Sequence, residues 1–297
     1  MKPASFEYQR AENLEHACEL LSEYGDDAKI LAGGQSLIAA MNYRLARPAV
    51  LVDIGHIDGK NEVVVGKDGV RVKATTTQKI VENNERVIVT LPVLTTAIGN
   101  IAHTQVRNRG TIGGSIVNAD PASELPAISL LLDAEFTVKS RSATRTIPAD
   151  EFFVTYMTTS LEPDEILTSI LFKIPPSDSG WAFREIVRRE GDYAMAGSSA
   201  VIDVGRNGKC CYSRLVVFGV AETPVRAIEV EEMLLGEKLS EALIKEASER
   251  IVELIDPEAD VHASESYRKN AAVTLLSRSI ADGLAKNELN KKRGEGE

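Results

Sequence analysis

Two glycine-containing turns are the segments of this 297-residue sequence best suited to bind a ligand through the backbone. The first is Ala32-Gly33-Gly34-Gln35-Ser36, which follows an apolar run and precedes residues of helical composition. Paired glycines expose backbone N–H groups and let a phosphate approach without an obstructing Cβ, and the Ser36 hydroxyl could add a donor. The spacing is neither that of a Walker loop nor GxGxxG. The alternative is a tight strand-to-helix turn that needs glycine for its backbone conformation.

The second candidate segment runs from Arg107 to Pro126 and is polar, with Gly110, Gly113 and Gly114 at its centre. Neither the helical nor the strand period explains this stretch, so we expect an irregular loop. A loop of this length is costly to order in a compact domain unless it binds something. A surface loop of turn-forming residues would have the same composition. Two such turns in one domain suit a diphosphate.

Metal binding and nucleophilic catalysis find little support in the sequence. The three cysteines, Cys18, Cys210 and Cys211, form neither a CxxC pair nor a Cys/His cluster suited to zinc or an iron–sulfur centre. Cys210 and Cys211 fall in an expected strand, where adjacent side chains point to opposite faces. The four histidines have no second ligand at metal spacing, and Ser36 is not part of a GxSxG elbow. We therefore expect no metal in this chain.

Short strands and helices must position the two turns. The first 55 residues or so are expected to form a small α/β layer, with strands at 6–8, 28–32 and 51–54 and helices at 12–24 and 37–44. A second subdomain follows, with a hairpin at 62–74, helices at 77–83, 93–102 and 123–132 (the last N-capped by Ser123), and strands at 136–139, 144–147 and 166–174.

A proline-rich junction at residues 175–180 is expected to separate two domains. Beyond it the pattern predicts strands at 181–187, 198–204 and 213–220 and helices at 226–235, 240–254 and 264–287. The predicted domains are thus 1–177, with subdomains of about 1–55 and 56–177, and 178–287, followed by a frayed tail at 288–297.

The overall composition excludes several classes of function. Hydrophobic residues make up 43% and charged residues 26%, as in globular proteins, and no apolar stretch is long enough for a membrane span. A net charge of −10 disfavours nucleic acid and anionic membranes as partners. The N-terminal residues have no signal-peptide or transit pattern, so we expect a cytoplasmic location.

Three segments, taken in order, resemble the FAD-binding medium subunit of the molybdenum hydroxylases, the family of xanthine dehydrogenase and carbon monoxide dehydrogenase. They are Ala32 to Leu37, Gln105-Val106-Arg107-Asn108 running into Thr111-Ile112-Gly113-Gly114, and Ala119-Asp120-Pro121-Ala122-Ser123. The resemblance covers essentially the whole chain. It implies an α+β fold: a two-subdomain FAD-binding domain of the PCMH/vanillyl-alcohol-oxidase-like type, then a C-terminal domain with a three-stranded antiparallel sheet and a helical bundle.

The resemblance also implies residue roles. Backbone N–H groups of 32–36 and 111–115 would be the main donors to the FAD pyrophosphate, Tyr193 would shield a face of the flavin ring, and Asp192 would lie near its reacting edge. An alternative for Tyr193 is a half-buried packing residue. The residues implied in FAD binding are Ala32, Gly33, Gly34, Gln35, Ser36, Leu37, Thr111, Ile112, Gly113, Gly114, Ser115, Asn118, Ser123, Glu124, Ile166, Leu167 and Arg184.

Three of these positions depart from the family's commonest pattern. Ser115 stands where asparagine is frequent, Asn118 where histidine or threonine is frequent, and Glu124 where aspartate is frequent.

The function that the resemblance implies is electron transfer within an oxidoreductase complex. Substrate would be oxidised at a molybdopterin cofactor in a large subunit, and electrons would cross two [2Fe–2S] clusters of a small subunit. FAD in this chain would then pass them to an external acceptor. The assembly would be a dimer of heterotrimers. The alternatives are a non-redox nucleotide- or phosphate-binding module and a stand-alone flavin reductase or oxidase.

Overall fold

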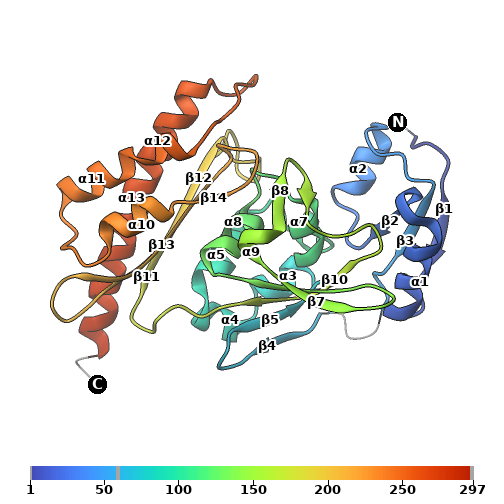
Figure 1. Ribbon diagram of the computed structural model, residues 1–297, viewed down its shortest axis with the longest axis horizontal. Coiled ribbons are helices and arrows are strands. Elements are labelled where there is room, and N and C mark those ends of the chain that lie inside the picture. The colour runs from blue at the N-terminus through green and yellow to red at the C-terminus, as the bar shows by residue number, and fades with distance from the viewer. Residues whose placement is uncertain (1, 58–60, 295–297) are drawn as a thin grey trace.

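The N-terminal subdomain is built around a three-stranded parallel sheet. The computed structural model describes residues 2–57 and 61–294, and this sheet lies at one end of the molecule (Figure 1). Its strand order is β1-β3-β2, and the elements are β1 (Glu7–Arg10), α1 (Leu14–Tyr24), a 3₁₀ turn (Gly25–Asp27), β2 (Ala28–Leu31), α2 (Leu37–Asn42) and β3 (Val50–Asp53). The expected α/β layer is therefore present.

Local chemistry explains the boundaries of α1. The Asn13 side chain accepts a hydrogen bond from the His16 N–H at 2.8 Å and so caps the first turn. Gly25, at φ +52°, ends the helix in a conformation that other residues rarely adopt. Ala17, Cys18, Leu20 and Leu21 are buried on one face of α1, against Val50 and Val52 of the sheet. This gives the subdomain a small core of its own.

The middle subdomain has a five-stranded antiparallel sheet in the order β4-β5-β10-β6-β7. Its strands are β4 (Val63–Val65), β5 (Val70–Lys73), β6 (Glu135–Lys139), β7 (Thr144–Pro148) and β10 (Ile166–Phe172), with a small hairpin of β8 (Phe153–Thr155) and β9 (Thr158–Thr159). Its helices are α3 (Gln78–Glu82), α4 (Glu85–Thr90), α5 (Pro92–Asn100), α6 (Thr104–Arg107), α7 (Ile112–Asn118), α8 (Glu124–Leu131) and α9 (Ala149–Phe152).

One expectation about this subdomain is wrong. The polar stretch between α5 and α8 is not an irregular loop, because most of it forms α6 and α7. Glycine and polar residues weaken a helical period in the sequence, but capping by Thr111 and burial of Ile112 and Ile116 stabilise α7 locally.

The C-terminal domain contains an antiparallel sheet in the order β11-β12-β13-β14, so a short fourth strand joins the three expected ones. The strands are β11 (Gly180–Ile186), β12 (Ala196–Val204), β13 (Cys210–Phe218) and β14 (Val225–Arg226). The helices are α10 (Ile228–Leu234), α11 (Glu241–Glu249), α12 (Ile251–Leu254) and α13 (Glu265–Gly294). Cys210 is buried and Cys211 exposed, as expected for neighbours on a strand.

Helix α13 continues to Gly294, so the tail that we expected to fray from residue 288 is helical up to that point. Asn287 is fully buried and its Nδ2 donates to the Asp178 carbonyl at 2.6 Å and to Asp203 Oδ1 at 2.8 Å. A Cβ on Gly180 would lie 1.8 Å from the Gly283 carbonyl oxygen. The C-terminal end of the junction at 175–180 is thus packed against α13.

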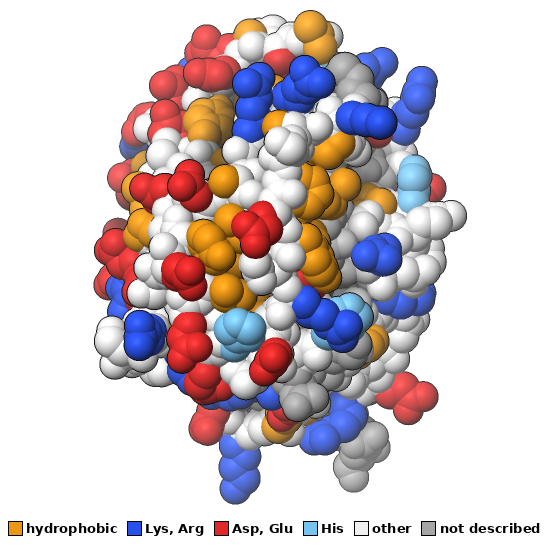
Figure 2. Space-filling model, turned by 90° about the vertical axis from the view of Figure 1, so that its right-hand side faces the viewer, with side chains coloured by type: hydrophobic (Ala, Val, Ile, Leu, Met, Phe, Trp, Pro, Cys, Tyr) orange, Lys and Arg blue, Asp and Glu red, His pale blue; other side chains and the backbone are white. Residues whose placement is uncertain are grey.

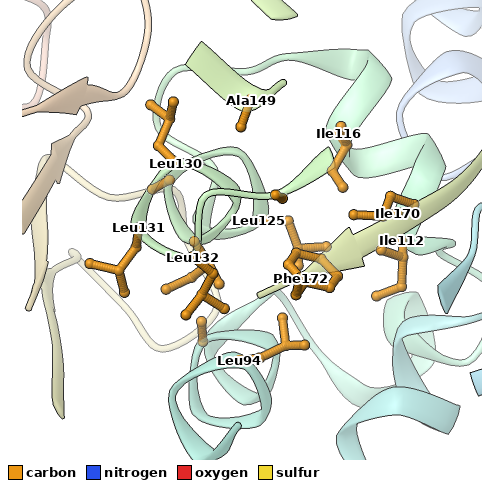
Figure 3. Packing of buried hydrophobic residues seen from close by; sticks show 14 of the residues in the cluster. Leu94, Ile112, Ile116, Leu125, Leu130, Leu131, Leu132, Ala149, Ile170 and Phe172 are labelled. Carbon is orange, nitrogen blue, oxygen red and sulfur yellow. The ribbon is translucent and has the colours of Figure 1, made fainter. Parts of the chain in front are cut away.

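The largest core runs continuously from the middle subdomain into the C-terminal domain. Figure 3 shows its centre, where Leu94, Leu125, Leu131 and Phe172 converge from helices and strand β10. The same cluster includes Val201, Val216 and Phe218 of the C-terminal sheet. The opposite face of that sheet packs against α13 and α10 in a second cluster.

The surface at the end of the molecule formed by the N-terminal subdomain carries acidic, basic and hydrophobic side chains. Figure 2 shows most acidic side chains on the left, lysine and arginine mainly at the top, on the right and at the bottom, and hydrophobic side chains in the middle. Leu45 is 84% exposed and Tyr43 69% exposed in this subdomain. Among the residues that the structure describes, no helix is long and apolar enough to cross a membrane.

Candidate functional site

The first glycine turn leaves a run of backbone donors free. It connects β2 to α2, and Gly34 adopts φ +73°. Within the described residues, the backbone N–H groups of Gly33, Gly34, Gln35 and Ser36 donate to no protein acceptor. Ser36 occupies the N-cap position without a capping side-chain bond. Consecutive free N–H groups of this kind are suited to an anion.

The two glycine turns meet directly. A Cβ on Gly33 would lie 2.4 Å from the Arg109 carbonyl oxygen and 2.9 Å from Gly110 Cα, closer than real Cβ atoms come. Only glycine at position 33 therefore lets the first turn rest on the second. This contact joins the N-terminal subdomain to the middle subdomain at the place where the sequence predicts a diphosphate.

The second turn is held by hydrogen bonds within the chain. Thr111 Oγ1 caps α7 by accepting from the Gly114 N–H at 3.0 Å, and the Gly113 N–H donates to the Ala74 carbonyl at 2.9 Å. The N–H groups of Ile112 and Ser115 also have carbonyl acceptors. Four of the five expected donors in 111–115 therefore have acceptors within the chain, and their role toward FAD stays a prediction. The free donors are concentrated in the first turn.

Arg107 stabilises the backbone that precedes the second turn. The residue is buried, and its guanidinium forms a two-point ion pair with Glu82 and donates to the carbonyls of Ile101 and Ala102 at 2.8 and 3.1 Å. The loop that carries Tyr193 rests on this segment, since a Cβ on Gly191 would lie 2.9 Å from Ala102. Arg107 thus fixes the backbone on which that loop lies.

Buried acidic groups gather beside Tyr193. Glu124, in the first turn of α8, is 5% exposed, and burial raises its pKa to about 8, with the charges of Glu185 and Asp120 adding to the effect. Burial also raises the pKa of Glu185 to about 7 and that of Asp120 above its usual range. Glu185 Oε2 is buried without a hydrogen-bond partner.

Tyr193 and Asp192 lie on the loop between β11 and β12. Tyr193 is 59% exposed. Burial of the hydroxyl end, with the nearby Asp120 and Glu124 carboxylates, raises the pKa of Tyr193 to about 12, so the phenol stays protonated at physiological pH. Asp192 is exposed, and its N–H donates to the Arg189 carbonyl at 3.0 Å.

Several predicted site residues have partners within the chain. Arg184 points toward α13 and pairs with Asp282, with Nε to Oδ2 at 2.7 Å. The strand neighbour Glu185 is the residue whose charge acts on Glu124. Ile166 and Leu167, at 3% and 5% exposure, are packed into the N-terminal and central cores.

Two further predicted residues, Ser123 and Asn118, lie at the ends of helices. Ser123 is buried at the N-cap position of α8 but forms no capping side-chain bond, contrary to expectation. Asn118 is the last residue of α7 and is partly exposed. Within the described ranges, no three His, Cys, Asp or Glu side chains are grouped so as to hold a metal ion.

Two family models match the chain. Residues 4–176 match the FAD binding domain in molybdopterin dehydrogenase, and residues 181–282 match the CO dehydrogenase flavoprotein C-terminal domain. The chain belongs to the FAD-binding subunits of the molybdenum hydroxylases. Such a flavin subunit is part of an oxidoreductase.

Individual relatives agree with this membership. The flavin subunit is 39% identical to the 6-hydroxypseudooxynicotine dehydrogenase complex subunit alpha of Paenarthrobacter nicotinovorans, over 96% of each chain. It is 35% identical to the caffeine dehydrogenase subunit beta of a Pseudomonas species, over 95% of each chain. A chain of the solved carbon monoxide dehydrogenase from Hydrogenophaga pseudoflava superimposes with a TM-score of 0.94 at 33% identity, covering 96% of this chain and 99% of that one.

The residues present fit the family's cofactor, FAD. The free N–H groups of the first turn and the Gly33 contact provide a cradle for a diphosphate that a larger side chain would close. The sequence motifs predicted the position of the first turn, and Asp120 lies in the third of the segments that carry the resemblance. The sequence did not predict Glu185, because a lone acidic residue in a strand carries no signal of its own.

Proposed function

We propose that this flavin subunit binds FAD across the contact between its two glycine turns and transfers electrons from [2Fe–2S] clusters of a small subunit to an external acceptor. When bound, FAD supplies a centre that accepts electrons one at a time and releases them singly or in pairs. The observation that carries the proposal is the Gly33 contact with Arg109 and Gly110, beside four unpaired backbone donors.

The roles of individual residues follow from their positions. The N–H groups of Gly33 to Ser36 would bind the diphosphate, with Leu37 at the start of α2 beneath them. Tyr193, exposed on its loop, would cover one face of the flavin ring, with Asp192 next to it. Glu124 and Ser123 at the start of α8 would lie toward the flavin and its ribityl chain. Arg184 is not part of this assignment, because Asp282 already pairs with it.

The proposal includes partner subunits. A relative is named as a subunit of a dehydrogenase complex, and others as medium chains or subunits. We propose a large molybdopterin subunit and a small iron–sulfur subunit as partners, assembled as a dimer of heterotrimers in the cytoplasm. The proposed division of the chain is a FAD-binding domain at 1–177 and a C-terminal domain from 178. The exposed Tyr43 and Leu45 support a surface that is covered in a complex.

Cofactor analysis of the purified full chain and of its co-purified complex tests this function. We expect a yellow protein that releases FAD on denaturation, and a complex that contains molybdenum and iron. A yellow chain that purifies without partners would indicate a stand-alone flavin reductase or oxidase. A colourless chain that does not bind added FAD but binds another phosphate compound would indicate a non-redox module.

A further inference from the structure

Residues 101–110, which include α6, contact both parts of the proposed FAD site. At one end, Gly33 of the first turn lies so close that an added Cβ would meet a carbonyl oxygen of this segment at 2.4 Å. At the other end lies the loop between β11 and β12 that carries Tyr193 (the Tyr193 loop). A Cβ on Gly191 of this loop would lie 2.9 Å from both the carbonyl carbon and the carbonyl oxygen of Ala102. One short segment thus connects the first glycine turn with the Tyr193 loop.

Two residues at the loop contact adopt left-handed backbone conformations. Ala102 has φ +42° and Gly191 has φ +85°. Glycine adopts this region freely, whereas alanine is strained there and remains in it only where its surroundings hold the backbone. The methyl side chain of Ala102 offers no hydrogen bond for this purpose. The conformation that receives Gly191 must therefore be held by neighbouring groups.

The guanidinium of Arg107 holds this backbone. Its Nη1 donates to the Ile101 carbonyl at 2.8 Å and to the Ala102 carbonyl at 3.1 Å, and the second of these carbonyls is the one on which Gly191 rests. Its Nε and Nη2 donate to the two carboxylate oxygens of Glu82 at 3.0 and 3.1 Å. A planar two-point pair fixes the orientation of a guanidinium as well as its position. These four contacts form the Arg107 clamp.

Helix α3 anchors the segment at both ends. Glu82, the partner of Arg107 in the clamp, is the last residue of α3. At the start of the same helix, the Gln78 N–H donates to the Gly110 carbonyl at 2.8 Å, and so holds the end of the segment that lies beside the first turn. Val81 of α3 is fully buried in the central core. The two contacts of residues 101–110 are therefore supported by one helix that is packed in the core.

We propose that Arg107 is a positioning residue that fixes the Tyr193 loop relative to the first glycine turn and thereby sets how Tyr193 covers the flavin ring. This inference rests on the proposed FAD site. The diphosphate and the ring of one dinucleotide reach different parts of the chain, so the groups that support each part must be held at a fixed separation. When the guanidinium is removed, Gln78 still holds Gly110 beside the first turn, but the Ala102 carbonyl loses this donor. FAD should therefore remain bound, while Tyr193 no longer covers the ring in one position.

Two variants and one matched control test the clamp. Arg107→Met removes the guanidinium but leaves its partner a cation, because Glu82 Oε2 also lies 3.6 Å from Lys79 Nζ. Arg107→Lys keeps the charge but cannot bind a carboxylate and two carbonyls in one plane. Arg145→Met is the control, because Arg145 on the edge strand β7 likewise binds a glutamate, Glu165, at two points and donates to a carbonyl.

Limited digestion of the full chain with trypsin, without FAD, measures how firmly the Tyr193 loop is held. Arg188 and Arg189 are exposed cleavage sites in this loop. Because cleavage follows local opening of the loop, we expect it to be about tenfold faster at these two residues in R107M than in wild type and R145M. Equal rates in the three proteins would overturn the proposal. Circular dichroism shows whether each variant is folded, and R107K, with a rate about threefold above wild type, replaces R107M if that variant is unfolded.

Fluorescence of the bound flavin shows whether the clamp acts through Tyr193, because a tyrosine packed against a flavin quenches its emission. We expect FAD bound to R107M to fluoresce about twofold more than FAD bound to wild type or R145M, with the Kd for FAD changed by less than about threefold. In a Tyr193→Ala background, Arg107→Met should change the fluorescence by less than about 1.2-fold, since the clamp then has no tyrosine to position.

The same twofold increase in the Tyr193→Ala background, or no increase in R107M, would overturn the proposal, because the first would reveal a general structural effect and the second no effect on the ring. A wild-type chain that resists trypsin better than R107M but binds no FAD would instead contradict the proposed function. The two failures are therefore distinguishable.

Discussion

Replacing Gly33 with alanine tests whether the two glycine turns form one cradle. The added Cβ would lie 2.4 Å from the Arg109 carbonyl oxygen, where ordinary contacts begin near 3.4 Å, so the turns must separate by about 1 Å. Overpacking of this kind costs about 1–3 kcal/mol. If the strain falls on the FAD-binding geometry, the Kd for FAD rises by about 5- to 150-fold.

In the assay the FAD-free chain is titrated with FAD, and binding is monitored by flavin fluorescence. Thermal unfolding of the same samples is measured in parallel. Gly99→Ala is the matched control, because Gly99 lies in α5 and a Cβ there meets nothing within 4 Å. This control should leave FAD binding unchanged and stabilise the chain by about 0.5–1 kcal/mol. If G33A binds FAD as tightly as G99A and unfolds at the same temperature, the two turns do not form a common cradle.

Three further changes have expected outcomes. Gly113→Ala brings a Cβ within 2.5 Å of Ala74 Cβ and should destabilise the fold by about 1–3 kcal/mol in denaturant unfolding; wild-type stability would contradict the close packing. Arg226→Met leaves Glu231, whose side chain is 5% exposed, without its bidentate partner and should cost about 3–5 kcal/mol, measured by chemical unfolding; a loss below about 1 kcal/mol would mean that the pair is compensated. Because the folded-state pKa of Glu124 is raised from 4.5 to about 8, its neutral form stabilises the fold at low pH, and this stability is lost as pH rises across that interval. Glu124→Gln should flatten this part of the pH profile in urea unfolding from about pH 5 to about pH 9, and an unchanged profile would refute the assignment.

The sequence allowed the position of the first turn to be predicted well, because glycines between an apolar strand and a helix are a local signal. The structure places Gly33 and Gly34 between β2 and α2 as expected. The sequence could not show which backbone N–H groups of the two turns stay free. That depends on distant carbonyls such as that of Ala74, which engages Gly113.

The register of β11 illustrates the limit of motif transfer. Arg184 is predicted as a flavin contact, and in the strand it pairs with Asp282 of α13. Adjacent strand residues point to opposite faces, so an error of one position changes the side of the sheet. The sequence also did not predict that α13 extends beyond residue 287. The segment after Asn287 is charged, which is typical of a frayed tail, but Asn287 itself is held by hydrogen bonds to Asp178 and Asp203.

The separate core of the N-terminal subdomain has a consequence for cofactor retention. Its strands and α1 pack mainly on one another, whereas the middle subdomain and the C-terminal domain share a single hydrophobic cluster. The cooperative units of unfolding should thus divide the chain near residue 55 rather than at the proline-rich junction. A dinucleotide that contacts the Gly33 turn on one side and Glu124 on the other would tether these two units by mass action. Local opening of the first 55 residues, without global unfolding, would then be the route by which the flavin leaves.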